Sequence, residues 1–219
     1  MIEIFWGRGS PYSWRVQLAL EITGIPYRSR QLHFAGEDLK SDEFLAINPR
    51  GQVPALRDGG FTLYESIAIL AYLDAIRPEP ALFGNAPEER GLIWRLIMEC
   101  VYYLEPHMTA FAGTIISGEL PEKTDEAIAS RRQVEQELDR LEVLLERNDY
   151  LAGNRLSAAD VAVYPVVQLL LIAARRENTE AVSGRLCRAD AHFPALKAWC
   201  RRIEALPGFE RTNPPHWRV

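Results

Sequence analysis

The stretch Ser10-Pro11-Tyr12-Ser13 decides how the first half of this chain folds. It follows the apolar run IEIFW at residues 2–6 and precedes an amphipathic segment that begins at Trp14. A short β-branched and aromatic run that stops at glycines predicts a strand, and the amphipathic segment predicts a helix. Because the N–H groups at a helix start are unpaired and the dipole is positive there, a hydroxyl at this turn can help to hold an anion such as a thiolate. Ser10 is therefore the first candidate for chemistry.

Beyond this turn the pattern continues as a βαβ start followed by a hairpin. The first helix is expected to end at Gly24, where glycine commonly terminates helices, and residues 27–32 have the pattern of a second strand. The sequence Asp58-Gly59-Gly60 separates two short strands at residues 55–56 and 61–63, which predicts a tight hairpin. Another helix is predicted directly after the hairpin.

A segment rich in proline and glycine at residues 78–87 has the composition of a linker. Beyond it the strand signals vanish and long helical patterns take over, at residues 88–111, 122–147, 157–175 and 194–206. We therefore divide the chain into an α/β domain at residues 1–77, the linker at 78–87 and an all-helical domain at 88–219. The segment 176–192, which separates two predicted helices, has no functional interpretation from the sequence.

The composition is that of an ordinary globular protein, with 219 residues of which 47% are apolar and 25% charged. The formal net charge of −5 disfavours a nucleic-acid partner, since no basic face is implied. Cys100, Cys187 and Cys200 are widely spaced and form no CxxC pair, so we expect neither a disulfide framework nor a metal site. No apolar run approaches the ~18 residues of a membrane span. We expect no membrane association, and a reducing cytoplasm fits the cysteine usage.

Several features of the sequence occur together in a fixed order and spacing. They are the Ser10–Ser13 turn, the run NPRGQVPAL at residues 48–56, the Glu65-Ser66 pair, the linker, the helical second half and the capping-box sequence SAAD at residues 157–160. In this combination the chain resembles the cytosolic glutathione transferase family, in particular its serine-type zeta-like, tau-like and phi-like members. The resemblance covers nearly the whole chain. It implies the glutathione transferase fold, an α/β N-terminal thioredoxin-like domain plus an all-α C-terminal domain, and a homodimer.

Within that resemblance, the Ser10–Ser13 turn has the spacing of the Cys-Pro-Tyr-Cys turn of related glutaredoxins, with both sulfurs replaced by oxygens. Disulfide exchange needs a thiolate attacker, so this turn is expected to hold a sulfur anion without bonding to it. The resemblance implies that Ser10 binds glutathione, the co-substrate, and stabilises its thiolate. Ser13, inside the first helical turn, stays an alternative, and Ser10 could also be a plain N-cap.

The resemblance assigns further residues to glutathione binding: Lys40, Gln52, Val53, Pro54, Glu65 and Ser66. The extended backbone of Val53, which precedes a proline, suits pairing with the cysteinyl part of the peptide. Ser66 at a helix start suits the γ-glutamyl carboxylate, and Glu65 suits its ammonium group. Lys40 and Gln52 are assigned to the glycine carboxylate, although a solvated surface lysine is an alternative for Lys40. Whether Pro54 is cis is not readable from the sequence.

The pocket for a small electrophilic substrate is assigned to residues from both halves of the chain: Pro11, Tyr12, Tyr103 and His107. Tyr103, His107 and Phe111 recur every four residues and are expected to share one helix face. A core stripe is the simpler interpretation, above all for Phe111. His107 is either a polar group in the pocket or an exposed or satisfied histidine.

The function that follows from the resemblance is glutathione S-transferase activity, by conjugation or by addition and elimination. Two alternatives stay open. A zeta-like isomerase of the maleylacetoacetate type would use the same thiolate to add to a double bond, permit rotation and leave. A module that uses this fold only to bind partners would lack catalysis, and the complete set of glutathione-binding residues argues against it.

Overall fold

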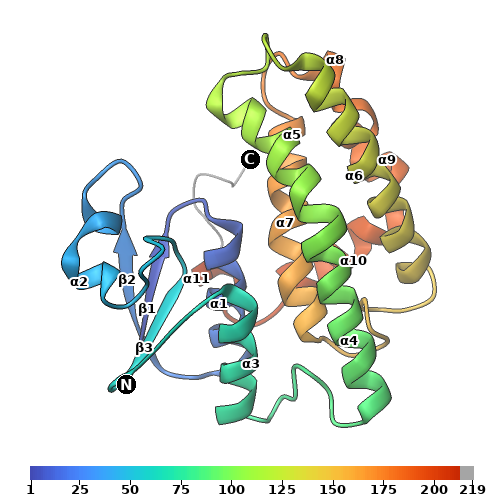
Figure 1. Cartoon of the computed structure of the whole chain (residues 1–219). Coiled ribbons are helices and arrows are strands. Elements are labelled where there is room, and N and C mark those ends of the chain that lie inside the picture. Colours follow the sequence, from blue (N-terminus) through green and yellow to red (C-terminus); the bar gives the residue numbers. More distant parts are fainter. Residues whose placement is uncertain (213–219) are drawn as a thin grey trace. The chain divides into compact units, whose positions relative to one another are not determined.

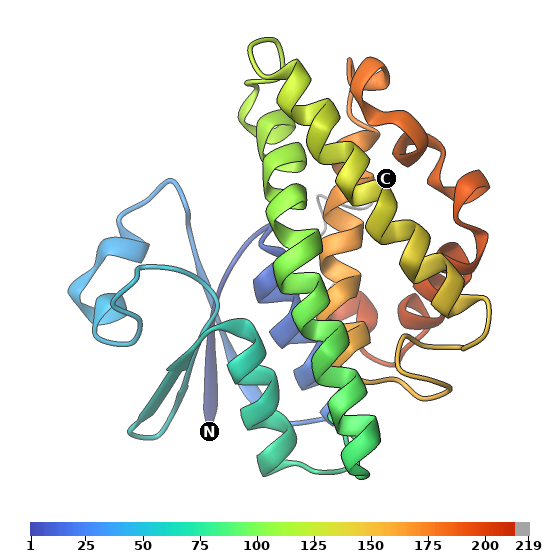
Figure 2. The ribbon, with the colours of Figure 1, turned by 45° about the vertical axis from the view of Figure 1, so that its right-hand side comes forward.

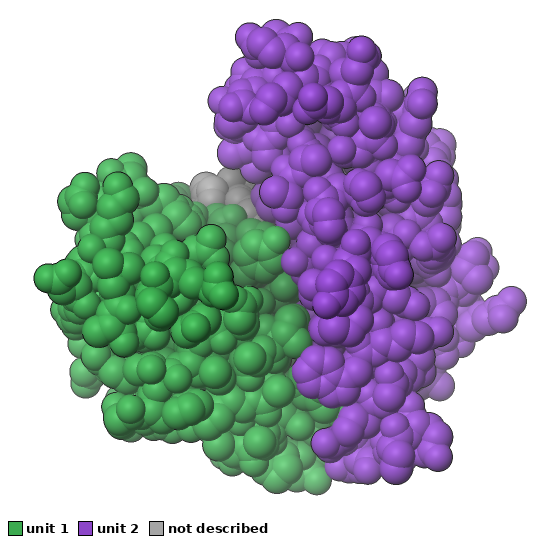
Figure 3. All heavy atoms as spheres, in the orientation of Figure 1, with its two compact units in different colours: residues 1–83, 206–219 green, residues 84–205 purple. Residues whose placement is uncertain are grey.

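The computed structural model describes residues 1–212 of the chain. The described residues form two compact units, one of residues 1–83 together with residues 206–212, and one of residues 84–205. They are called unit 1 and unit 2 and are coloured separately in Figure 3.

Unit 1 is built on a four-stranded mixed sheet in the order β2-β1-β3-β4, with β1 parallel to β2 and the other pairs antiparallel (Figure 1). Helices α1 and α3 pack against each other, and α2 lies on the opposite side of the sheet (Figures 1 and 2). The described elements of unit 1 are β1 (Ile2–Gly7), α1 (Pro11–Thr23), β2 (Tyr27–Leu32), η1 (Asp38–Lys40), α2 (Asp42–Leu45), β3 (Ala55–Asp58), β4 (Phe61–Tyr64), α3 (Ser66–Ile76) and α11 (Phe209–Thr212).

Local signals in the sequence account for most of these boundaries. α1 begins at Pro11, whose fixed φ suits the first helical position, and it ends at Thr23, where Gly24 caps it with a φ of 66°. The β3–β4 hairpin turns at Gly59, which has a φ of 60° that glycine adopts without strain. The predicted strand, helix, strand and hairpin of the first half are confirmed.

The regular elements among the described residues of unit 2 are all helices, and Tyr150 and Gly153 form an isolated β-bridge. α5 packs against α6 and α7. At the start of α7, the buried Asp160 carboxylate accepts hydrogen bonds from the Ser157 N–H at 2.9 Å and from the Trp199 Nε1 at 2.8 Å. The predicted capping box is confirmed. The elements of unit 2 are α4 (Pro87–Glu99), η2 (Cys100–Leu104), α5 (Glu105–Ser117), α6 (Thr124–Leu145), α7 (Ala158–Ala174), α8 (Glu180–Ser183), η3 (Gly184–Arg188), α9 (Ala189–His192) and α10 (Pro194–Glu204).

The single helix predicted at residues 88–111 is wrong in detail. A π-helical turn, η2, interrupts it, and α5 continues to Ser117. The N–H of Glu105 donates to the carbonyl of Cys100, five residues earlier. Pro106 follows directly and has no N–H to donate, which favours a widened turn at this point.

Residues 206–212 return to unit 1, which differs from the predicted range of 88–219 for the helical domain. The rings of Trp14 and Phe209 lie 5.9 Å apart, and Trp14 Nε1 donates to Thr212 Oγ1 at 3.0 Å. These contacts attach α11 to α1. The last part of the predicted domain, residues 213–219, lies outside the described residues. Within residues 1–212, no helix is both long and apolar enough to cross a membrane.

Candidate functional site

Several chain segments meet at one end of the sheet in unit 1. Ala55, the first residue of β3, pairs with Phe5 near the end of β1 and with Tyr64 at the end of β4. The segments that follow β1 and β4 and the segment that precedes β3 therefore lie side by side. They contain most of the predicted glutathione-binding residues.

Ser10 is the N-cap of α1 and is 9% exposed. Its Oγ accepts a hydrogen bond from the Ser13 N–H at 3.1 Å. The hydroxyl hydrogen donates to no other described residue, because the interactions of Ser10 among residues 1–212 are made by its Oγ as acceptor and by its main chain. The hydroxyl therefore keeps a donor for a ligand at a helix start, where the dipole favours an anion.

Ser13 has a different environment. Its side chain is 1% exposed, and its Oγ accepts from the Gly7 N–H at 3.3 Å. This bond connects the first turn of α1 to the end of β1. The deeper burial of Ser13 and its bond to β1 indicate a structural role, whereas Ser10 keeps slightly more exposed surface.

The bend before β3 presents unpaired main-chain groups. The Val53–Pro54 peptide bond is cis, and Val53 makes no main-chain hydrogen bond with another of residues 1–212. Asn48 holds the bend from inside, since its Nδ2 donates to the Gln52 carbonyl at 2.6 Å and its Oδ1 accepts from the Arg50 N–H at 3.0 Å. The sequence analysis included Asn48 in a motif but gave it no role. It fixes the peptide edge that Val53 offers.

Glu65 and Ser66 lie where β4 gives way to α3. Glu65 is exposed and has a φ of 70° and a ψ of 112°, a conformation that costs a non-glycine residue about 1–3 kcal/mol. Ser66, the first residue of α3, is 7% exposed. The strained residue Glu65 is therefore the exposed N-cap of α3, and the buried Ser66 follows it directly.

Arg15 is a residue of this site that the sequence analysis missed. It is 1% exposed, its Nη1 donates to Ser66 Oγ at 3.3 Å, and its guanidinium lies 5.1 Å from the centre of the Tyr12 ring. A buried arginine is unusual and needs partners. Its position in the otherwise apolar stripe of α1 is the sequence signal that could have indicated it.

Lys40 and Gln52 are exposed and lie on two chain segments that contact each other. A Cβ on Gly51, which has a φ of 61°, would lie 2.9 Å from the Leu39 carbonyl, so the turn that carries Lys40 contacts the bend that carries Gln52. The side chain of Lys40 has no hydrogen bond or ion pair with another described residue, which leaves its charge available.

The predicted electrophile residues belong to different parts of the chain. Pro11 is buried and Tyr12 half-buried in the first turn of α1. Tyr103 lies in the π-helical turn η2 and is 56% exposed, and His107 is half-buried in α5. Phe111 is fully buried, so its core interpretation is confirmed. Tyr103 and His107 belong to unit 2, and their role stays a prediction.

A cavity of about 450 Å³ within unit 1 borders Ser10. Trp6, Gln17 and Tyr27 contribute to its lining, and Arg211 closes part of it from α11. Arg211 binds the Glu21 carboxylate, which also accepts from the Tyr27 hydroxyl at 3.0 Å. Burial and the Glu21 carboxylate raise the pKa of Tyr27 to about 12, so this phenol is neutral at physiological pH. Local sequence carries no signal for this cavity, because Arg211 comes from the other end of the chain.

Comparison with family models gives two matches that together cover most of the chain. The family described as "Glutathione S-transferase, N-terminal domain" matches residues 9–76, and "Glutathione S-transferase, C-terminal domain" matches residues 97–207. Within residues 1–212, no cluster of three or more histidine, cysteine or acidic side chains could hold a metal ion.

Similar proteins of known name fall into two groups. The chain is 28% identical to glutathione S-transferase A of Pleuronectes platessa over 99% of this chain and 92% of that protein. It is 31% identical to maleylacetoacetate isomerase of Rattus norvegicus over 94% of this chain and 88% of that protein. Among solved structures, a glutathione transferase family member from Pseudomonas fluorescens with two glutathione bound has a TM-score of 0.83 at 23% identity, covering 96% of this chain and 91% of that one.

Proposed function

The chain belongs to the glutathione S-transferase family, and on that premise we propose that it binds glutathione and that Ser10 stabilises the bound thiolate for attack on a small electrophile. The observation that carries the proposal is the hydrogen bonding of Ser10. Its Oγ accepts from the Ser13 N–H, and its hydroxyl hydrogen is left to donate at the start of α1.

The energies suffice for this role. A free thiol has a pKa near ~8.5, and lowering it by about two units takes ~2.7 kcal/mol of preferential thiolate stabilisation. A hydrogen bond to a charged group contributes roughly 1.5–3 kcal/mol, and a helix start adds about 0.3–1 kcal/mol. One hydroxyl at one helix start is therefore enough, and no general base is required.

The remaining residues orient the peptide. The main chain of Val53, held by Asn48, pairs with the cysteinyl part of glutathione. Ser66 and the first turn of α3 bind the γ-glutamyl carboxylate, and Glu65 binds the ammonium group. Lys40 and Gln52 face the glycine carboxylate. Pro11 and Tyr12, together with Tyr103 and His107 of unit 2, contact the electrophile.

Ultraviolet difference spectroscopy tests the proposal. Glutathione is titrated into the protein at pH values below the pKa of its free thiol, and the thiolate absorbance is recorded. We expect a thiolate band with the native protein and a weak one with Ser10→Ala. S-methylglutathione, which has no thiol, is the control for binding without ionisation. An undiminished band in Ser10→Ala, together with its loss in Ser13→Ala, would transfer the role to Ser13.

Isomerisation is the second candidate, because maleylacetoacetate isomerases are among the relatives at similar identity. In that reaction the thiolate sulfur adds to one carbon of the double bond, which becomes a single bond and can rotate. Elimination then breaks the new carbon–sulfur bond, restores the double bond and returns glutathione. A transferase instead consumes one glutathione per product. Turnover of a cis-dienoic acid with a trace of glutathione supports the isomerase, whereas stoichiometric loss of glutathione with halogenated aromatics, enones or epoxides supports the transferase.

We further propose that the protein is a cytoplasmic homodimer, as the resemblance implies. We also propose that its domains follow the ranges 1–77 and 88–219 with a linker at 78–87, and that residues 206–212 at the end of the second range pack back on unit 1. Sedimentation velocity measures the oligomeric state. Limited proteolysis followed by mass spectrometry locates the linker, and cleavage outside residues 78–87 would contradict the proposed boundary.

A further inference from the structure

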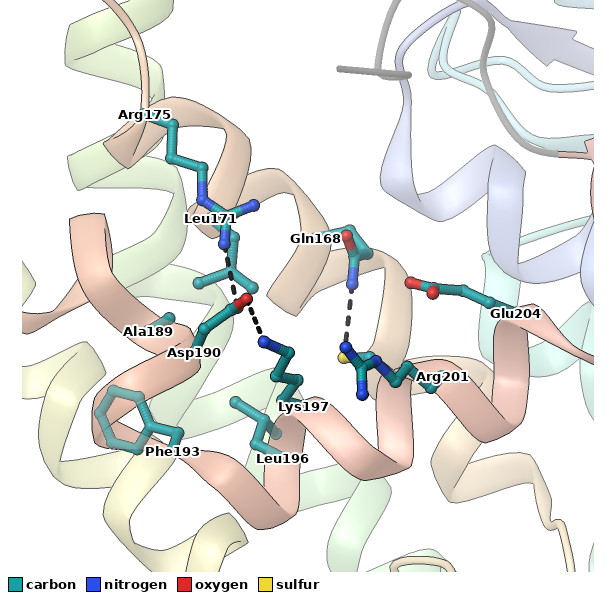
Figure 4. Close-up of a pocket in the computed structure, with 11 residues that line it drawn as sticks. Gln168, Leu171, Arg175, Ala189, Asp190, Phe193, Leu196, Lys197, Arg201 and Glu204 are labelled. Carbon is teal, nitrogen blue, oxygen red and sulfur yellow. Dashed lines mark hydrogen bonds and ion pairs between the residues drawn. The ribbon is translucent and has the colours of Figure 1, made fainter.

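A cavity of about 240 Å³ lies within unit 2, between α7, α9 and α10 (Figure 4). We name it the Cys200 cavity after the thiol that it contains. None of the predicted glutathione or electrophile residues lines it. α9 belongs to the segment 176–192, for which the sequence indicates no function. The cavity therefore has no part in the function proposed above.

The inner wall of the Cys200 cavity carries no formal charge. Leu171, Phe193 and Leu196 are buried and contribute apolar surface. Gln168 Nε2 donates towards Cys200 Sγ at 3.4 Å (Figure 4). Burial raises the pKa of the Cys200 thiol, so it stays neutral at physiological pH. An apolar group of a ligand would be favoured against this wall.

The rim of the cavity is positively charged overall. Asp190 is already neutralised, because its carboxylate binds Arg175 Nη2 at 3.2 Å and Lys197 Nζ at 2.5 Å (Figure 4). Glu204 accepts from the Tyr164 hydroxyl at 3.1 Å. Three cations and two carboxylates thus leave one net positive charge around the opening.

Arg201 is the rim cation that has no ion-pair partner among the described residues, whereas Arg175 and Lys197 share Asp190. Its guanidinium makes no hydrogen bond or ion pair with another of residues 1–212, and it influences Asp190 only through its charge. Arg201 is one of the residues that line the cavity, and its side chain is drawn in Figure 4. A planar guanidinium in this position presents paired donors that match a carboxylate.

We propose that the Cys200 cavity binds a small organic anion, a carboxylate or sulfonate on an apolar body, with the anionic group at Arg201 and the apolar body against Leu171 and Phe193. The volume lies just below the ~300–1,000 Å³ of sites for drug-sized molecules, so the ligand is a small one. The ligand would connect α9 to α10 and give the segment 176–192 a binding function.

The test uses 4-(trifluoromethyl)benzoate observed by fluorine NMR, with 4-(trifluoromethyl)benzamide as the uncharged control. We expect the benzoate to bind the full chain and Arg201→Gln to weaken that binding by about tenfold or more, as the loss of one charged hydrogen bond implies. Arg202→Gln is the matched control, because the neighbouring Arg202 binds the Asp149 carbonyl and carboxylate. Arg201 is exposed, so its replacement leaves folding intact.

Alkylation of the cysteines locates the ligand. Slow modification of Cys200 by N-ethylmaleimide, followed by mass spectrometry, is expected to slow further with benzoate, whereas modification of Cys187, which lies in η3 and does not line the cavity, is unaffected. Excess S-methylglutathione is expected to leave benzoate binding unchanged, which separates this site from the glutathione site. The proposal is overturned by no binding up to the solubility limit of the probe, by equal binding of benzoate and benzamide, by equal effects of the two arginine variants, or by displacement with S-methylglutathione.

Discussion

Arg15 Nη1 donates a hydrogen bond to Ser66 Oγ at 3.3 Å, and both side chains are buried. This contact joins the second turn of α1, the helix that Ser10 caps, to the first residue of α3. A buried guanidinium also adds positive potential near Ser66, where the γ-glutamyl carboxylate of glutathione is proposed to bind. We therefore predict that Arg15 is a positioning residue that acts through Ser66.

Replacement of Arg15 tests that role. Arg15→Gln is expected to raise the KM for glutathione about tenfold, equivalent to ~1.4 kcal/mol, with a smaller effect on kcat. Arg15→Lys retains the charge and is expected to recover part of the KM. Steady-state kinetics with glutathione varied and the electrophile saturating provide the measurement. Equal losses in KM and kcat, with no recovery in Arg15→Lys, would indicate a purely structural arginine.

The two serines of the first turn are expected to respond differently to removal of the hydroxyl. Ser10→Ala removes the N-cap of α1 and is expected to lower the free energy of unfolding by about 1 kcal/mol. The same variant is expected to raise the pKa of the bound glutathione thiol by about one to two units. Ser13→Ala leaves the buried Gly7 N–H without its acceptor and is expected to cost about 1–3 kcal/mol of stability with the thiol pKa retained. Urea unfolding and thiolate absorbance measure the two effects, and parallel changes in both variants would contradict this division.

The strained backbone of Glu65 predicts a trade-off between stability and binding. Glycine adopts a φ of 70° without strain, so Glu65→Gly is expected to raise the free energy of unfolding by up to about 1 kcal/mol. Glu65→Ala keeps the strain and serves as the matched control. Both variants lose the carboxylate and are expected to bind glutathione about tenfold more weakly in calorimetry. Stabilisation by alanine as well as glycine would show that strain is not the cause.

The ion cluster around Glu3 predicts a pH-dependent stability. Arg57 and Arg30 donate to the Glu3 carboxylate at 2.8 and 3.2 Å, and the Arg57 hydrogen bond above all lowers the pKa of that carboxyl. A carboxyl whose pKa is lower in the folded state contributes stability above its unfolded pKa near ~4.3, and the contribution is lost as the pH falls through the folded value.

Glu3→Gln is therefore expected to lower the free energy of unfolding by about 1 kcal/mol at pH 7. The difference in unfolding free energy from the native protein should narrow as the pH falls below about 4. Urea unfolding at a series of pH values measures it. Glu43→Gln is the control, since Glu43 is exposed and has no ion-pair partner among residues 1–212. A difference that stays constant with pH would show that packing, not charge, is responsible.

Much of the fold could be predicted from the sequence because its signals are local. Gly24 and Gly59 mark chain reversals by their backbone freedom, and the SAAD sequence at residues 157–160 marks a helix start. The glutathione-binding candidates likewise came from ordered motifs, and the structure brings the ends of β1 and β4 and the start of β3 together at one edge. Their roles in binding stay predictions.

What the sequence determined by itself is the position of turns and caps, since these depend on the conformational preferences of a few neighbouring residues. Tertiary structure alone decided the buried contact of Arg15 with Ser66, the return of α11 to Trp14 and the cavity that α7, α9 and α10 form around Cys200. Each of these features brings together residues that are far apart in the sequence. Such contacts depend on packing of the whole unit, which no local preference encodes.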